Sequence, residues 1–399
     1  MFIDRTYSNV VTDRANVLII TLFNILLLVD SLNGYCLDKG ISFPISQALK
    51  ILLLLLMSFQ MLQQISSRII LWSILFYSVI LILFFSFKVN FLYSQTFAHL
   101  FKFLLIPCSY FYFKNLIYSN PRLRYKQIIR ILKVNTCVLV VNILLVLVGL
   151  GTKSYSDIGS KGYFYAANEL SGLLLLFCPC ILYYIGRKYT LSSIKYYVLI
   201  GIFLLTVLLL GTKSSIISYV ISSFVVSRLL MNNKKSYLRL YLFGLVIAII
   251  IIILGYRLLN SLGFWERWAF FYDKGGILLL LLSGREEYWL EEKSDLLEGG
   301  IGNIIMGLGE ARTVEMDIFD TFLNYGIIGV TIIYSFFFYL LYRAYQKKNQ
   351  NSWAKVVLFI NVMLIIASSL SGHIVFSGMA GPFIALVNVL VLIPNKYIS

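Results

Sequence analysis

Long apolar runs recur along the whole chain and are separated by short polar segments. A run of about 20 residues crosses about 30 Å of hydrocarbon as an α-helix, because each residue rises about 1.5 Å. The pattern therefore predicts an all-α polytopic membrane protein with about twelve transmembrane helices. The predicted spans are 16–31, 45–63, 69–87, 97–117, 129–150, 168–186, 194–211, 214–231, 238–257, 319–342, 354–372 and 376–394.

Composition fits a chain that is embedded in a membrane. Hydrophobic residues make up 59% of the 399 positions and charged residues only 13%, whereas soluble proteins carry about 25% charged residues. This composition excludes a soluble enzyme, a disordered chain and a secreted disulfide scaffold. The chain has two His and five Cys, and the neighbouring Cys178 and Cys180 point in different directions on one predicted helix. We therefore expect no metal site and no cofactor.

The basic residues indicate how the spans are oriented. They lie in short clusters between apolar runs rather than in one dense tract mixed with exposed aromatics, so we expect no nucleic-acid partner despite the net charge of +16. With a cytoplasmic N-terminus, 21 of the 34 Lys and Arg residues fall on the cytoplasmic side. The positive-inside rule then predicts that both termini are cytoplasmic. Few bases remain in the short loops of the opposite face, namely Lys39, Lys50, Lys88, Lys102, Lys153, Lys161 and Lys213.

One long polar segment interrupts the rhythm of short loops. It divides the chain into helices one to nine (1–257), a large outer loop (258–318) and helices ten to twelve (319–399). Twelve of the 18 acidic residues lie between 258 and 320, together with several Trp and Tyr residues that argue against disorder. Rings such as Tyr288 and Trp289 beside carboxylates suit a carbohydrate ligand. They are also typical of an aromatic belt at a membrane surface.

Four charged residues in or beside this loop are candidates for chemistry. Arg285, in the stretch 283–289, offers a planar cation for phosphate oxygens, or else pairs with a neighbouring Glu. Glu315, Asp317 and Asp320 stand at the start of predicted helix ten. A carboxylate in this place serves as a general base for a sugar hydroxyl, or it complements the helix dipole and caps free amides.

Three motifs follow one another in the last third of the chain: Ser-Gly-Arg-x-x-x-Trp at 283–289, Gly-x-Gly at 307–309 and Asn-Tyr-Gly-Ile-Ile-Gly at 324–329. In these motifs the chain resembles the O-antigen polymerase (Wzy-type) and O-antigen ligase superfamily of bacterial membrane glycosyltransferases. Weaker similarity lies in 166–169, which contains Asn168, and in 211–215, which contains Lys213.

The resemblance implies a GT-C-like, metal-independent enzyme of the bacterial cytoplasmic membrane with its active face toward the periplasm. It would transfer a growing glycan from undecaprenyl diphosphate onto the next lipid-linked repeat unit, alongside a flippase and a chain-length regulator. Arg285 would then hold the diphosphate with help from Lys213 and Arg312, and Glu315 would act as base. The same resemblance implies substrate contacts for Asn168.

Two other functions remain open. The first is transfer to another acceptor by an O-antigen ligase-type enzyme, which is disfavoured because no His lies in the loop and His99 and His373 lie elsewhere. The second is a flippase for lipid-linked oligosaccharides. Transporters tend to have charges near the membrane midplane and internal repeats. The predicted spans here are nearly free of charge and show no repeat of six helices, so polymerisation is the favoured function.

Overall fold

The computed structural model describes residues 3–63, 68–73, 93–153, 159–191, 193–231, 264–309, 313–370 and 372–398, and these ranges are almost entirely helical. This confirms the predicted all-α class; a two-stranded hairpin of β1 (Thr152–Lys153) and β2 (Ser160–Gly162) is the exception. The α-helices are α1 (Ile3–Asn24), α2 (Leu26–Asp38), α3 (Ile45–Leu62), α5 (Tyr93–Ser119), α6 (Pro121–Leu144), α7 (Ala167–Tyr189), α8 (Ile194–Leu210), α9 (Lys213–Leu230), α12 (Phe264–Leu282), α13 (Arg285–Glu298), α14 (Gly300–Met306), α15 (Asp317–Lys347), α16 (Ala354–Leu370) and α17 (Gly381–Val389).

Several of these helices are membrane spans by length and composition. Within the described ranges six helices meet that test, and the pair α1–α2, bent by 51°, makes a seventh. The helices α8, α16 and α17 are apolar but shorter. They lie where spans 194–211, 354–372 and 376–394 were predicted. The predicted spans 238–257 and most of 69–87 lie outside the described residues, so the number twelve stays a prediction.

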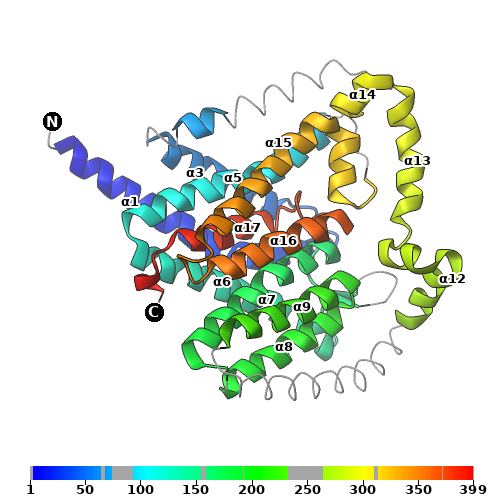
Figure 1. Cartoon of the computed structure of the whole chain (residues 1–399). Coiled ribbons are helices and arrows are strands. Elements are labelled where there is room, and N and C mark those ends of the chain that lie inside the picture. The colour runs from blue at the N-terminus through cyan, green and yellow to red at the C-terminus, as the bar shows by residue number, and fades with distance from the viewer. Residues whose placement is uncertain are drawn as a thin grey trace.

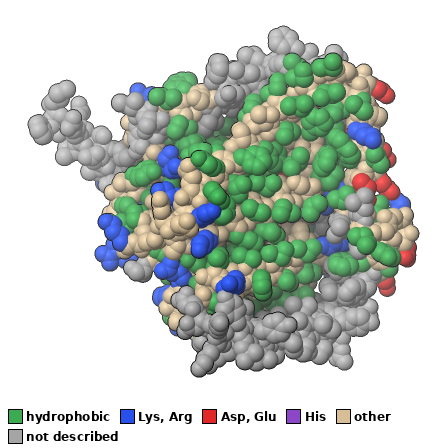
Figure 2. All heavy atoms as spheres, viewed as in Figure 1, with side chains coloured by type: hydrophobic (Ala, Val, Ile, Leu, Met, Phe, Trp, Pro, Cys, Tyr) green, Lys and Arg blue, Asp and Glu red, His purple; other side chains and the backbone are tan. Residues whose placement is uncertain are grey.

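The core is built around α7 and α17. Every residue of α17 is buried, and α7 packs against α6, α8, α9, α16 and α17. A helix that is apolar on all sides is stable only when other helices surround it, as Figure 1 shows for these two. Phe177 of α7 and Phe383 of α17 meet edge to face with ring centroids 5.0 Å apart. The outer helices expose Leu, Ile and Phe instead, which forms the broad apolar surface in Figure 2.

Charged side chains gather at two ends of this bundle. In Figure 2, most Lys and Arg lie on the left, whereas Asp and Glu lie on the right together with a few more bases. In Figure 1 both chain termini lie on the left and α12 and α13 lie on the right. At the basic end, Lys133 of α6 lies over the ring of Tyr184 of α7, and Lys195 of α8 lies over Tyr189, each 4.2 Å from the centroid. The clusters predicted to be cytoplasmic therefore meet in space.

Short polar signals set where the helices begin. Asn120 accepts a hydrogen bond from the amide of Leu123 and is followed by Pro121, so the chain turns directly from α5 into α6. Thr212 caps α9 in the same way by accepting from the amide of Ser215. Gly211 ends α8 in the left-handed conformation, which lets α9 start two residues later.

The long outer segment is folded. Its described part forms α12, α13 and α14, with breaks at Gly284, Gly299 and Gly307. The apolar run 277–282 is the second half of α12, after a kink at Gly275 and Gly276. Trp289 packs α13 onto α15, with its ring 4.7 Å from that of Phe319. This packing holds the start of α13 close to the start of α15.

Candidate functional site

Arg285 and Glu315 form an ion pair where α13 begins and the chain approaches α15. The Nε and Nη2 atoms of Arg285 donate to Oε2 of Glu315 at 3.3 and 3.0 Å, and Nη1 donates to the carbonyl of Leu370 at 3.0 Å. The Arg285 side chain is 12% exposed and that of Glu315 is 44% exposed. Arg285 therefore does not pair with the adjacent Glu286 or Glu287, the alternatives left open by the sequence.

Glu287 binds a different base. Its carboxylate contacts the ammonium of Lys274 at 2.8 Å, on the exposed surface between α12 and α13. This hydrogen bond raises the pKa of Lys274 above its usual value. Because both side chains are about half exposed, the pair contributes little to stability.

Lys213, for which the resemblance implied a role beside Arg285, lies next to this ion pair. It is the first residue of α9, and its Nζ donates to Oγ of Ser283 at 3.2 Å, two residues before Arg285. The same ammonium lies 5.4 Å from the ring of Trp268 and 5.2 Å from that of Phe271. These α12 rings hold Lys213 by cation–π attraction. Two cations from different helices thus flank the tight turn at 283–284.

The backbone at Glu315 is strained. Its φ is +58°, which a residue with a side chain rarely adopts, and Gly372 packs directly against it. A Cβ added to Gly372 would lie 2.6 Å from the carbonyl carbon of Glu315, so only glycine fits there. Strained backbone of this kind persists where its surroundings enforce it, and functional sites are such places.

The carboxylates of Asp317 and Asp320 each accept hydrogen bonds from backbone amides. The Asp317 carboxylate accepts from the amides of His373, Ile374 and Val375 at 2.6, 2.8 and 2.7 Å. Asp320 accepts from the amide of Val314 at 2.6 Å. Both side chains are buried. Neither acid caps the free amides of α15, because the amides they bind lie outside that helix. These contacts favour a structural role for both acids and leave the more exposed Glu315 as the candidate base.

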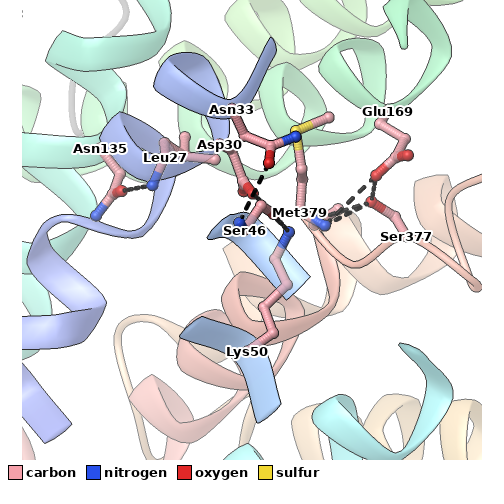
Figure 3. Close-up of polar contacts among 10 residues, drawn as sticks. Leu27, Asp30, Asn33, Ser46, Lys50, Asn135, Glu169, Ser377 and Met379 are labelled. Carbon is pink, nitrogen blue, oxygen red and sulfur yellow. Dashed lines mark hydrogen bonds and ion pairs between the residues drawn. The ribbon is translucent and has the colours of Figure 1, made fainter. Parts of the chain in front are cut away.

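The amides bound by Asp317 belong to a non-helical segment that sequence analysis missed. Segment 372–380 joins α16 to α17, and most of it is buried. Glu169 of α7 also holds it, by accepting from the hydroxyl of Ser377 and, at 3.4 Å, from the amide of Met379 (Figure 3). Non-helical backbone inside a membrane protein is stable only when protein or a polar cavity surrounds it. The repeated Gly at 372, 378 and 381 was the available signal.

Both histidines lie at this segment. His373 is part of it, has a φ of +69° and follows the glycine that packs on Glu315. His99 of α5 stacks on Phe376 with ring centroids 5.4 Å apart. The loop 258–318 itself holds no His, but segment 372–380 brings the residue His373 close to Glu315 through the adjacent Gly372. Among the described residues no group of three or more His, Cys, Asp or Glu could hold a metal ion.

The remaining candidates occupy different surroundings. Asn168 is buried in the first turn of α7, next to Glu169. The hydroxyl of Ser171, two residues after the stretch 166–169, lies 2.7 Å from that of Thr212 in the stretch 211–215. Tyr288 is 58% exposed and so stays a candidate for sugar contact.

Two candidates are less suited to a ligand or cannot be placed. Trp289 is packed against α15 and is less available to a sugar. Arg312 lies outside the described residues.

Comparison with known proteins identifies the family. A family model described as "O-antigen ligase like membrane protein" matches residues 14–261, more than half of the chain. The chain belongs to this family. No curated protein and no solved structure matches the chain. Membership in the O-antigen ligase-like family, together with the apolar helices, indicates a multi-pass membrane protein that acts on glycans. The matched range includes Asn168 and Lys213 and ends before Arg285 and Glu315.

Proposed function

We propose that this member of the O-antigen ligase-like family is a polysaccharide polymerase. It transfers a growing glycan from undecaprenyl diphosphate onto the next lipid-linked repeat unit at the periplasmic face of the bacterial cytoplasmic membrane. The observation that carries the proposal is the meeting of Arg285, Lys213 and Glu315, since Lys213 reaches Ser283 and Glu315 binds Arg285. The three residues come from three separated parts of the chain.

The chemistry follows from these groups. A hydroxyl of the acceptor sugar attacks the anomeric carbon of the donor glycan, and the bond from that carbon to the diphosphate oxygen breaks. Glu315 takes the hydroxyl proton through Oε1, the carboxylate oxygen to which Arg285 does not donate. The leaving diphosphate keeps the bonding electron pair, and Arg285 and Lys213 stabilise its negative charge. Arg285 has five N–H donors, of which Glu315 and Leu370 use three within the described structure.

A second function, O-antigen ligase-type transfer to another acceptor, is favoured by one specific observation. His373 follows Gly372, which packs on the backbone of Glu315, so the same segment offers an imidazole as an alternative base. The reaction at the donor would be the same, and only the acceptor would differ. Family membership makes the flippase function the weakest of the three.

Deletion of the gene, followed by electrophoresis of the surface glycan, tests these functions. We expect the deletion strain to carry a single repeat unit on its acceptor, which establishes polymerisation. Long lipid-linked glycan that accumulates without attachment would identify a ligase instead. Single units that stay on the cytoplasmic leaflet would identify a flippase and would remove the proposed site.

The variant Arg285→Lys is expected to lose most polymerisation although the charge is kept. Lys cannot form the planar fork that binds Glu315 and a phosphate together. Loss of one charged hydrogen bond in the transition state corresponds to about 10–100-fold in rate. The measurement is the length distribution of the glycan at matched protein level. Lys274→Arg, in the exposed pair with Glu287, is the control and should leave the distribution unchanged. Normal long chains from Arg285→Lys would remove Arg285 from the site.

A further inference from the structure

A second group of basic side chains lies against segment 372–380, on helices that the proposed reaction does not use. A Cβ added to Gly378 would lie 3.5 Å from Nζ of Lys50 and 3.8 Å from Cγ of Lys102. Lys50 belongs to α3, and Lys102 lies on α5 three residues after His99, whose ring stacks on Phe376. Three basic side chains from two helices therefore converge on the stretch 376–378.

Lys50 is held in place by an ion pair inside the bundle. Its Nζ lies 2.6 Å from Oδ1 of Asp30, and the two side chains are 10% and 3% exposed. Ser46 donates its hydroxyl to the same oxygen and its amide to Asn33 (Figure 3). The expectation that the spans are nearly free of charge is wrong here. Charged side chains within membrane-spanning helices are rare and often have a function.

Among the described residues, no acid neutralises the charge of Lys102. Two acids face this region: Asp30, which neutralises Lys50, and Glu169, whose Oε2 accepts from the hydroxyl of Ser377 and the amide of Met379. Lys102 is half-buried and makes no ion pair with any residue that the structure describes. A lysine in a membrane-spanning helix usually pairs with an opposite charge or with backbone carbonyls, or extends to the interface. An anion bound by Lys50, Lys102 and His99 together would supply such an opposite charge.

We propose that Lys50, Lys102 and His99 form a second anion site, which binds the diphosphate of the second lipid-linked substrate. The inference rests on the proposed function, because polymerisation needs two lipid diphosphates at one time and Arg285 with Lys213 serves only one. The buried segment 372–380 lies between the two sites, since Gly372 contacts Glu315 and Gly378 contacts the lysines. An anionic phospholipid headgroup offers similar phosphate chemistry, and the test separates the two sources.

The test is native mass spectrometry of the purified full chain, titrated with undecaprenyl diphosphate or with phosphatidylglycerol. We expect the wild type to bind two molecules of the diphosphate. In Lys102→Gln one of the two should bind about 10–100-fold more weakly, as expected when a charged hydrogen bond is lost. Arg285→Gln should weaken binding of the other diphosphate molecule, and the double variant should weaken binding of both. Lys102→Arg should restore the second site.

Lys39→Gln is the matched control, because Lys39 is an exposed lysine in the loop between α2 and α3. It should bind two molecules as the wild type does. Unchanged binding of both diphosphates by Lys102→Gln would overturn this inference alone. If Lys102→Gln bound phosphatidylglycerol more weakly but undecaprenyl diphosphate as the wild type does, the inference would also be overturned. The lysines would then bind bulk lipid. A wild type that binds no undecaprenyl diphosphate would instead overturn the proposed function.

Discussion

Replacing Glu315 by Gln is expected to slow glycan transfer by about 10²–10⁴-fold, the usual loss when a general base is removed. The structure explains why this substitution tests the base and little else. Both hydrogen bonds from Arg285 end on one carboxylate oxygen, Oε2. The carbonyl of Gln can take that position and keep Arg285 in place. The other oxygen becomes an NH₂ group, which cannot accept the proton of a sugar hydroxyl.

The measurement is transfer by purified protein with lipid-linked repeat units, together with binding of undecaprenyl diphosphate. Binding and the amount of folded protein should stay close to wild type, while turnover falls. Glu291→Gln, which changes an exposed acid on the same outer segment, is the control and should have no effect. An active Glu315→Gln combined with an inactive His373→Gln would move the base to His373. An active Glu315→Gln with an inactive Asp320→Asn would move it to Asp320.

Some residues of this site could be predicted from motifs in the sequence. The Ser-Gly-Arg stretch placed a cation at the start of α13, and the Gly-Thr-Lys stretch placed another at the start of α9. Two such positions meet whenever the outer ends of their helices pack together, so the pairing of Lys213 with Ser283 was within reach of sequence reasoning. The family resemblance implied that Glu315 and Arg285 serve one site, and the structure pairs their side chains.

Other parts did not follow, because hydropathy averages over about 19 residues and hides short irregular backbone. The run from α16 to α17 was predicted to have a break of three residues, whereas α17 begins only at Gly381. The pair of Asp30 and Lys50 was hidden in the same way, since a single charge barely changes the mean of an apolar window. Which backbone amides an acid binds depends on tertiary packing, and no local pattern shows that Asp317 reaches residue 373.

Replacing Asp317 by Ala is expected to destabilise the protein rather than to remove a chemical step. Residue Asp317 is 1% exposed, and its carboxylate accepts hydrogen bonds from three consecutive amides of the segment before α17. Its loss leaves three buried N–H groups unpaired, and each costs about 1–3 kcal/mol, so the free energy of unfolding should fall by at least about 3 kcal/mol. The free energy of unfolding of Asp317→Asn should lie between those of the wild type and Asp317→Ala, because the amide oxygen of Asn still accepts two of the hydrogen bonds.

Thermal unfolding in detergent, followed by the loss of the monodisperse peak, measures this effect. Asp273→Asn, which changes an exposed acid of α12, should melt with the wild type. The folded fraction of Asp317→Asn, assayed at low temperature, should transfer glycan at a rate close to wild type, which separates this acid from Glu315. Because Asp317 holds the segment that carries His373 on one side and Gly378 on the other, its loss should also weaken diphosphate binding in proportion to unfolding. An Asp317→Asn protein that melts normally and transfers no glycan would contradict this structural role and return Asp317 to the reacting groups.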